Sequence, residues 1–187
     1  TDTVVLDGGD SISVVASRVG PGAEGDGGGV TITTKSLELK NGAFITVGTA
    51  GEGNGGVVTI TTKSLELKNG AFISAGTEAK GDGGAVNINA TETVVFEGGD
   101  SSAAVDSLVF PGAEGSGGNV SITTGSLELK NGATIGTNTQ GEGDAGNVSI
   151  TTGSLELENG AIITVGTLGE GDAGAVNINA TETVVFD

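Results

Sequence analysis

The chain has 187 residues, and its 7 basic against 24 acidic side chains give a net charge of −17, which excludes nucleic acid as a partner because phosphate binding needs a basic face. The same charge disfavours an anionic membrane surface, and no run approaches the ~20 apolar residues of a membrane-spanning helix, so we expect no membrane insertion. Cys, His, Met, Trp and Tyr are absent, which excludes disulfide, thiolate and imidazole chemistry; we expect no cofactor, with calcium as the one open alternative.

A repeated unit runs along the chain. Its Val-x-Ile opening recurs at spacings of 28, 28, 34, 28 and 28 residues: Val30, Val58, Val86, Val120, Val148 and Val176. A longer period of 90 residues lies over the first, because the similar segments TDTVVLD, TETVVFE and TETVVFD begin at Thr1, Thr91 and Thr181. A fixed period of about 20 to 50 residues is typical of solenoids, whose units bury their apolar faces only against neighbours. We expect one continuous domain, 1–187, made of two 90-residue repeats (1–90 and 91–180) and the start of a third (181–187).

Each unit contains three short runs in which apolar and polar residues alternate, the pattern of half-buried strands. In the unit that begins at Val30 these runs are 30–33, 36–40 and 43–47, and their inward side chains are Val30, Ile32, Leu37, Leu39, Ala43, Ile45 and Val47. We predict an all-β fold, a parallel β-solenoid (β-helix) with three strands per rung and about six rungs, at ~4.8 Å per rung. Three strands in 28 residues are too few for a propeller blade.

The loop that closes each unit is rich in glycine and acidic residues, as in Glu24-Gly25-Asp26. Carboxylates and backbone carbonyls in such a loop are ligands that Ca²⁺ accepts. The candidate calcium ligands are Glu24, Asp26, Glu52, Asp82, Glu142, Asp144, Glu170 and Asp172. The alternative is a flexible acidic loop without metal, because calcium-binding nonapeptide repeats recur at a much shorter spacing than these loops.

Threonines form columns on the outward side of the first strand: Thr31, Thr33, Thr59, Thr61, Thr123 and Thr151. Ice-binding solenoids present hydroxyl and methyl groups in a flat grid at strand spacing, so this side is a candidate ice-binding surface. Asn87 and Asn89, and later Asn177 and Asn179, interrupt the grid. Threonine is also simply a polar residue suited to strands, and both interpretations stay open.

Two further columns are interpreted as structural. Glutamates occupy the outward side of the second strand, and we expect a solvated face: Glu38, Glu66, Glu128 and Glu156. Two residues on, the first three are followed by Lys40, Lys68 and Lys130, and Glu156 is followed by Glu158. Asparagines precede glycine at the following turn: Asn41, Asn69, Asn131 and Asn159. They suit the left-handed backbone region, and their amides are expected to stack as a ladder.

We expect no enzymatic activity. Enzymes on β-solenoids carry a paired acid and base, or metal-bridged carboxylates with a basic residue, in a groove with irregular walls. This chain has a single arginine, Arg18, and a 90-residue duplicate predicts no asymmetric site. The predicted role is therefore structural. The alternative is a binding module that uses an outer face, either for ice at the threonine grid or for carbohydrate bridged by Ca²⁺ at the acidic loops.

Three segments resemble a known family: GNVSITTGSLELKNGA (118–133), GEGDAGNVSITTGSLEL (141–157) and GDAGAVNINATETVVF (171–186). They are similar to the repeats of filamentous-haemagglutinin-type exoproteins exported by two-partner secretion, especially the cyanobacterial ones. The resemblance covers essentially the whole chain. It implies a right-handed parallel β-helix in a secreted or cell-surface fibre, with a role in adhesion or in the extracellular matrix, and it transfers no binding residue to a numbered position.

The expected partners follow from this interpretation. No secretion signal begins at Thr1 and neither end carries a polar cap, so we expect an excerpt of a longer array, or a chain that stacks end to end with copies of itself. Carbohydrate or other cell-surface material is the expected external partner, and the expected location is extracellular.

Overall fold

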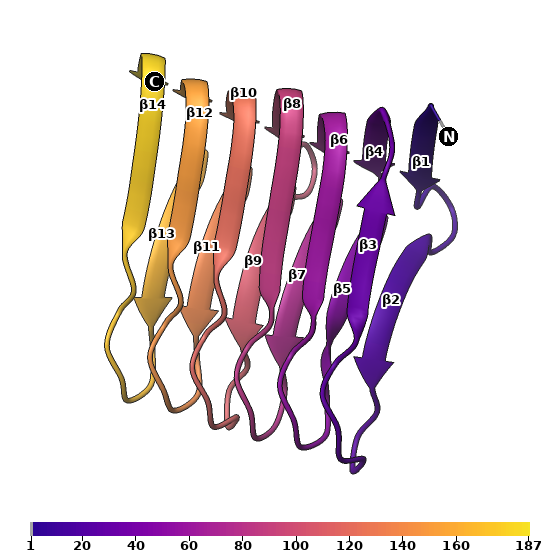
Figure 1. Ribbon diagram of the computed structural model, residues 1–187, viewed down its shortest axis with the longest axis vertical. Coiled ribbons are helices and arrows are strands. Elements are labelled where there is room, and N and C mark those ends of the chain that lie inside the picture. Colours follow the sequence, from indigo (N-terminus) through magenta and orange to yellow (C-terminus); the bar gives the residue numbers. More distant parts are fainter. Residues whose placement is uncertain (1) are drawn as a thin grey trace.

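The computed structural model describes residues 2–187, which form 14 strands and no helix. Thr1, the first residue of the 90-residue repeat, lies outside the described residues. Each strand pairs in parallel with its counterpart in a neighbouring rung, and about six turns stack along one axis (Figure 1). The predicted all-β parallel β-solenoid is therefore confirmed. With no helix among residues 2–187, the described chain has no helical segment that could cross a membrane.

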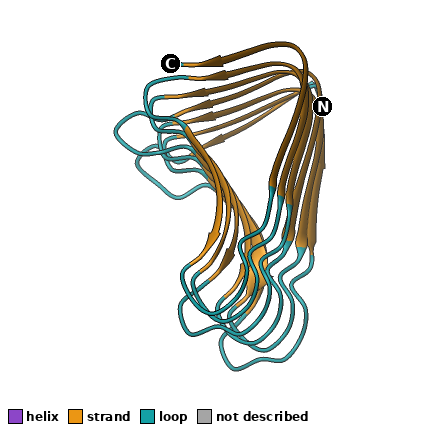
Figure 2. Cartoon of the chain, turned by 90° about the vertical axis from the view of Figure 1, so that its left-hand side faces the viewer, coloured by secondary structure: helices purple, strands orange, loops and turns teal. Residues whose placement is uncertain are grey.

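Two sides of each rung belong to one larger sheet, sheet A, in the order β1-β4-β6-β8-β10-β12-β14, with β3 paired to β6. Its strands are β1 (Thr3–Asp7), β3 (Gly29–Thr33), β4 (Ser36–Lys40), β6 (Val57–Lys68), β8 (Ala85–Glu97), β10 (Val120–Lys130), β12 (Val148–Leu157) and β14 (Val176–Phe186). The first and second predicted strands of a unit are separate only as β3 and β4. In β6, β8, β10, β12 and β14 they form one continuous strand that bends at the corner between the two sides of sheet A (Figure 2). A buried threonine lies at that corner in β6, where the Thr62 hydroxyl donates to the Ser64 carbonyl at 2.9 Å.

The third side of each rung is sheet B, in the order β13-β11-β9-β7-β5-β2. Its strands are β2 (Val14–Val19), β5 (Phe44–Thr49), β7 (Phe72–Thr77), β9 (Ala104–Val109), β11 (Thr134–Thr139) and β13 (Ile162–Thr167). Loops at both ends of sheet B join it to sheet A, which closes the roughly triangular outline of Figure 2.

The core is a set of apolar columns between the two sheets. Leu37, Leu65 and Val94 are neighbours in register and fully buried, and the same holds for Ile45 and Ile73 on sheet B. Burying each large aliphatic side chain contributes roughly 1.5–3 kcal/mol. The predicted inward residues are confirmed: Val30, Leu37, Leu39, Ala43, Ile45 and Val47 are buried, and Ile32 is partly buried against the core. Ile32 is less covered because β3 pairs with β6 alone.

The Asn-Gly turns confirm the predicted left-handed geometry and amide ladder. Asn41, Asn69, Asn131 and Asn159 have φ of 53°, 47°, 54° and 51°. The Asn69 amide donates to the Asn41 side-chain oxygen at 3.0 Å, and Asn159 donates to Asn131 at 3.3 Å. Asn41 in turn donates to the Asp7 carboxylate, and this bond lowers the pKa of Asp7.

Candidate functional site

The acidic loops form a hydrogen-bonded ladder instead of the flexible segments considered as an alternative. The backbone N–H of Gly53 donates to the Lys80 carbonyl, and that of Gly81 donates to the Glu114 carbonyl, each at 2.8 Å. Glycine is required at the centre of the loop: Gly81 has a φ of 143°, and a Cβ there would lie 2.1 Å from the Gly53 carbonyl oxygen. The loops therefore stack as regularly as the strands do.

The loop aspartates hold this ladder together. A carboxylate oxygen of Asp26 accepts a hydrogen bond from the backbone of Asn54, Asp82 accepts one from Ser116, and Asp144 accepts one from Asp172, each at 2.8 Å. Among residues 2–187, no group of three or more Asp or Glu side chains is close enough to hold a metal ion. The eight candidate ligands are thus spread along the stack, and calcium binding stays a prediction.

The threonine columns exist as predicted on the outer side of sheet A. Thr31 lies beside Thr59, and Thr33 lies beside Thr61, with exposed or half-exposed side chains. In the next rung β8 places Asn87 in the first column and an asparagine in the second. The grid is therefore interrupted after two rungs, and ice binding remains a prediction.

Lysines pair with glutamates in three rungs of sheet A, whereas in the rung of β12 Glu158 replaces the lysine and raises the pKa of Glu156. Lys68 pairs with Glu66 at 2.6 Å and Lys130 pairs with Glu128 at 3.0 Å, and these hydrogen bonds raise the pKa of both lysines. In β8 the column position opposite Glu66 is Val95, so the stack of like charges is broken there. Ion pairs that are open to solvent contribute little to stability, which fits a solvated face.

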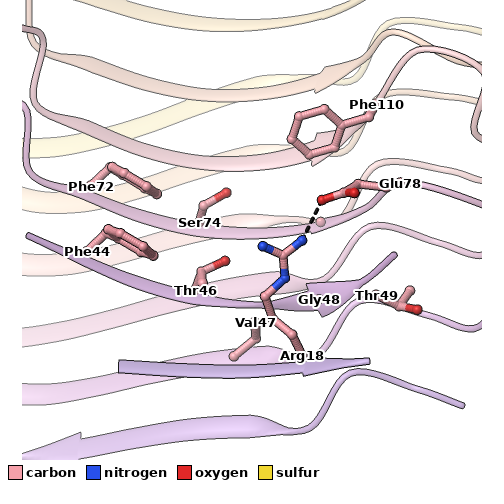
Figure 3. A pocket seen from close by; sticks show the side chains of 11 residues that line it. Arg18, Phe44, Thr46, Val47, Gly48, Thr49, Phe72, Ser74, Glu78 and Phe110 are labelled. Carbon is pink, nitrogen blue, oxygen red and sulfur yellow. Dashed lines mark hydrogen bonds and ion pairs between the residues drawn. The ribbon is translucent and has the colours of Figure 1, made fainter. Parts of the chain in front are cut away.

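A different kind of surface lies on the outer face of sheet B. A cavity of about 240 Å³ opens there across β2, β5 and β7, and we call it the sheet B groove (Figure 3). Its main lining side chains are aromatic, charged and hydroxylic: Arg18, Phe44, Thr46, Phe72, Ser74, Glu78 and Phe110. None of these residues was a candidate from the sequence.

One wall of the groove is aromatic and the other is charged. Phe44 and Phe72, which are partners in register, stack with ring centroids 4.7 Å apart and planes 4° from parallel. Opposite them, Arg18 on β2 reaches past β5 to form an ion pair with Glu78, which follows β7 (Figure 3). The two charged side chains are 47% and 43% exposed, so they remain open to solvent.

Hydroxyl groups lie between the walls. Thr46 and Ser74 are register partners, and the column continues to Asp106 in β9. The Ser74 hydroxyl donates a hydrogen bond to the Asp106 carboxylate. Burial raises the pKa of Asp106 to about 6, and the bond from Ser74 opposes this shift. No lysine or arginine within residues 2–187 forms an ion pair with Asp106.

This groove is the asymmetric feature that the duplicated sequence did not predict. Arg18 and Glu78 are 60 residues apart in the chain and meet because stacking places three rungs side by side. A signal was present in the 90-residue repeat: Phe44 and Phe72 correspond to Thr134 and Ile162 in the second copy. Aligning the two copies and marking outward positions that differ would have located the groove.

No protein family, no curated protein and no solved structure matches this chain.

Proposed function

We propose that this chain is a rigid rod segment of a secreted or cell-surface fibre, of the kind found in filamentous-haemagglutinin-type exoproteins, with a non-catalytic role in adhesion or in the extracellular matrix. The observation that carries the proposal is the uninterrupted register. Strands, turns and acidic loops all repeat from rung to rung with hydrogen bonds along the stack. A body held together along one axis resists bending and keeps its outer faces at fixed positions.

The two ends of the stack support the proposal further. Within residues 2–187, β13 and β14 pair only with the rung before them, and β2 and β3 pair only with the rung after them. The inward residues of the last rung are uncovered: Ile178 is 40% exposed, whereas its register partner Ile150 is 1% exposed. Unpaired strand edges beside apolar columns accept another strand. A further rung, from the same array or from another copy, would complete them.

Light scattering and negative-stain microscopy of the 187-residue chain test this proposal. As concentration rises, we expect growth into filaments one solenoid wide, with and without millimolar calcium. Ile178→Lys should stop the growth, because it places a charge in the column that the next rung must cover. Asn177→Lys, on the outer side of the same strand, is the matched control and should leave growth intact. Chains that stay monomeric at every concentration, or that grow equally well with Ile178→Lys, would contradict end-to-end addition.

A further inference from the structure

The sheet B groove occurs in only one of the two 90-residue repeats. The inward residues of the two copies agree, as in Leu37 and Leu127 or Ile45 and Ile135. The groove residues do not: Arg18, Phe44, Phe72 and Glu78 correspond to Leu108, Thr134, Ile162 and Leu168. Stacking and core packing are satisfied by either set of side chains. The rod role therefore does not require the groove residues.

The hollow is built into the backbone. Gly48 and Gly76 lie under the Arg18 side chain, in the column next to Thr46 and Ser74. A Cβ at Gly48 would lie 2.3 Å from the Gly76 carbonyl oxygen, and one at Gly76 would lie 2.5 Å from the Leu108 carbonyl oxygen. No residue larger than glycine fits at these two positions without backbone movement, so the space above them stays open.

The lining is suited to an uncharged ligand with both apolar and hydroxyl surfaces. The rings of Phe44 and Phe72 offer apolar contact that is already rigid, because they stack on each other. Arg18 can donate and Glu78 can accept hydrogen bonds, yet their charges cancel in the ion pair. The Thr46 hydroxyl makes no hydrogen bond within residues 2–187 and is available to a ligand. A few placed polar groups on an aromatic surface are typical of small-molecule sites.

The volume of the groove and the net charge of the chain limit which ligands the groove can bind. Pockets for drug-sized ligands measure roughly 300–1,000 Å³, so a cavity of about 240 Å³ suits a single ring of a larger molecule. The net charge of −17 repels acidic ligands. Sugar rings combine apolar C–H faces with hydroxyl edges, which matches the two walls. We propose that the sheet B groove binds a neutral saccharide, with one sugar ring between the Phe44–Phe72 stack and the Arg18–Glu78 pair.

Ligand-observed NMR with neutral tetrasaccharides tests the proposal. The probes are cellotetraose, maltotetraose, xylotetraose, mannotetraose and N-acetylated chitotetraose, and tetragalacturonate is the acidic comparison. At least one neutral probe should bind with a Kd at or below about 1 mM. Tetragalacturonate should bind at least about tenfold more weakly because of charge repulsion. Absence of binding by all neutral probes at about 5 mM would overturn the proposal, as would binding of acetyl-arginine amide alone, which would favour a protein partner.

Variants can copy residues that the second repeat already holds at the same place in the fold. Phe44→Thr with Phe72→Ile, and separately Arg18→Leu with Glu78→Leu, should each weaken saccharide binding at least about tenfold, or about 1.4 kcal/mol, without a loss of cooperative melting. The control, Thr61→Ala on the outer side of sheet A, should leave binding unchanged. Equal binding by the wild type and the Phe44→Thr/Phe72→Ile variant would place the saccharide elsewhere. Filament growth measures the rod role separately for the Phe44→Thr/Phe72→Ile variant, because β5 and β7 are paired on both sides, whereas Arg18 lies on β2 at an open edge.

Discussion

The outer faces of sheets A and B differ in how far their residues are kept between the two 90-residue repeats. On sheet A many outward positions keep the same or a similar residue in the two repeats, such as Thr61 and Thr151 or Glu66 and Glu156, whereas Lys63 and Lys68 are replaced by Gly153 and Glu158. On sheet B, Phe44 in the first repeat faces solvent where the second repeat has Thr134. Most inward positions below both faces keep the same residue in the two repeats, with exceptions such as Val47 and Thr137 or Ala75 and Val165. Stacking thus constrains the inward columns and the turns, while the outer face of sheet B is free to specialise.

The largest effect is expected for a charge placed in a repeated inward column. Leu65 is fully buried between Leu37 and Val94. Leu65→Asp removes a side chain whose truncation alone costs about 2–5 kcal/mol, and it adds an unpaired buried carboxylate. We expect a loss of at least about 4 kcal/mol and joint melting of several rungs in circular dichroism. A melting temperature near that of the wild type would mean that the inward assignment is wrong.

The next effect concerns the repeated loop. Gly81→Ala forces a side chain into a backbone region with φ of 143°, against the Gly53 carbonyl. We expect destabilisation of about 1–3 kcal/mol, measured by thermal or urea unfolding. Gly20→Ala is the control, because a Cβ at Gly20 meets nothing within 4 Å, and it should change stability by less than about 0.5 kcal/mol. Equal effects of the two changes would show that the loops are not held in register.

A pH-dependent effect is expected beside the groove. Asp106 has a pKa of about 6 in the folded chain, above its ordinary value of 3.8. A raised pKa means that the folded state binds the extra proton between pH ~4 and ~6, so stability falls as pH rises through this window and stays lower above it. Asp106→Asn keeps the hydrogen bond from Ser74 and removes the ionisation. We expect it to stabilise the chain at pH 7 by up to about 3 kcal/mol and to have little effect at pH 4.

Unfolding of the wild type and of Asp106→Asn at both pH values checks this directly. The difference between the two proteins at each pH cancels the contribution of the other carboxylates. A constant difference at pH 4 and pH 7 would contradict the raised pKa of Asp106 in the folded chain.

The smallest effect is expected on the repeated outer face of sheet A. Thr59→Ala removes a hydroxyl and a methyl group from a half-exposed position in a threonine column. We expect a change within about 0.5 kcal/mol in the free energy of unfolding. A large loss of stability would show that the column contributes to the fold and is not only a surface.

The period-2 pattern predicted the strands and the core because burial constrains every second residue, and the repeat made each pattern visible several times. Leu37 and Ile45 were placed correctly for this reason. The pattern carries no information on whether a strand continues around a corner, so the bend at Thr62 within β6 was missed. The period-2 pattern also does not show which residues of neighbouring rungs lie side by side. Arg18 and Glu78 meet only once the register of β2, β5 and β7 is known.

The acidic loops were only partly predictable. Their residue types suggested calcium ligands, because carboxylates beside glycine are compatible with both metal binding and backbone hydrogen bonding. The stacking geometry shows a structural use: Asp82 accepts a hydrogen bond from the backbone of Ser116 one rung later. Predicting these hydrogen bonds requires the distance between successive loops, and residue composition does not give that distance.

We propose that one repeating interior supports a rod whose sheet B face, and not its sheet A face, is a binding surface. A crystal structure of the chain soaked with the tetrasaccharide that binds most tightly tests it most directly. We expect a sugar ring between the Phe44 and Phe72 rings and the Arg18–Glu78 pair, with the threonine columns and the acidic loops free of ligand. Saccharide bound over Thr31 and Thr59, or along the acidic loops, would contradict it.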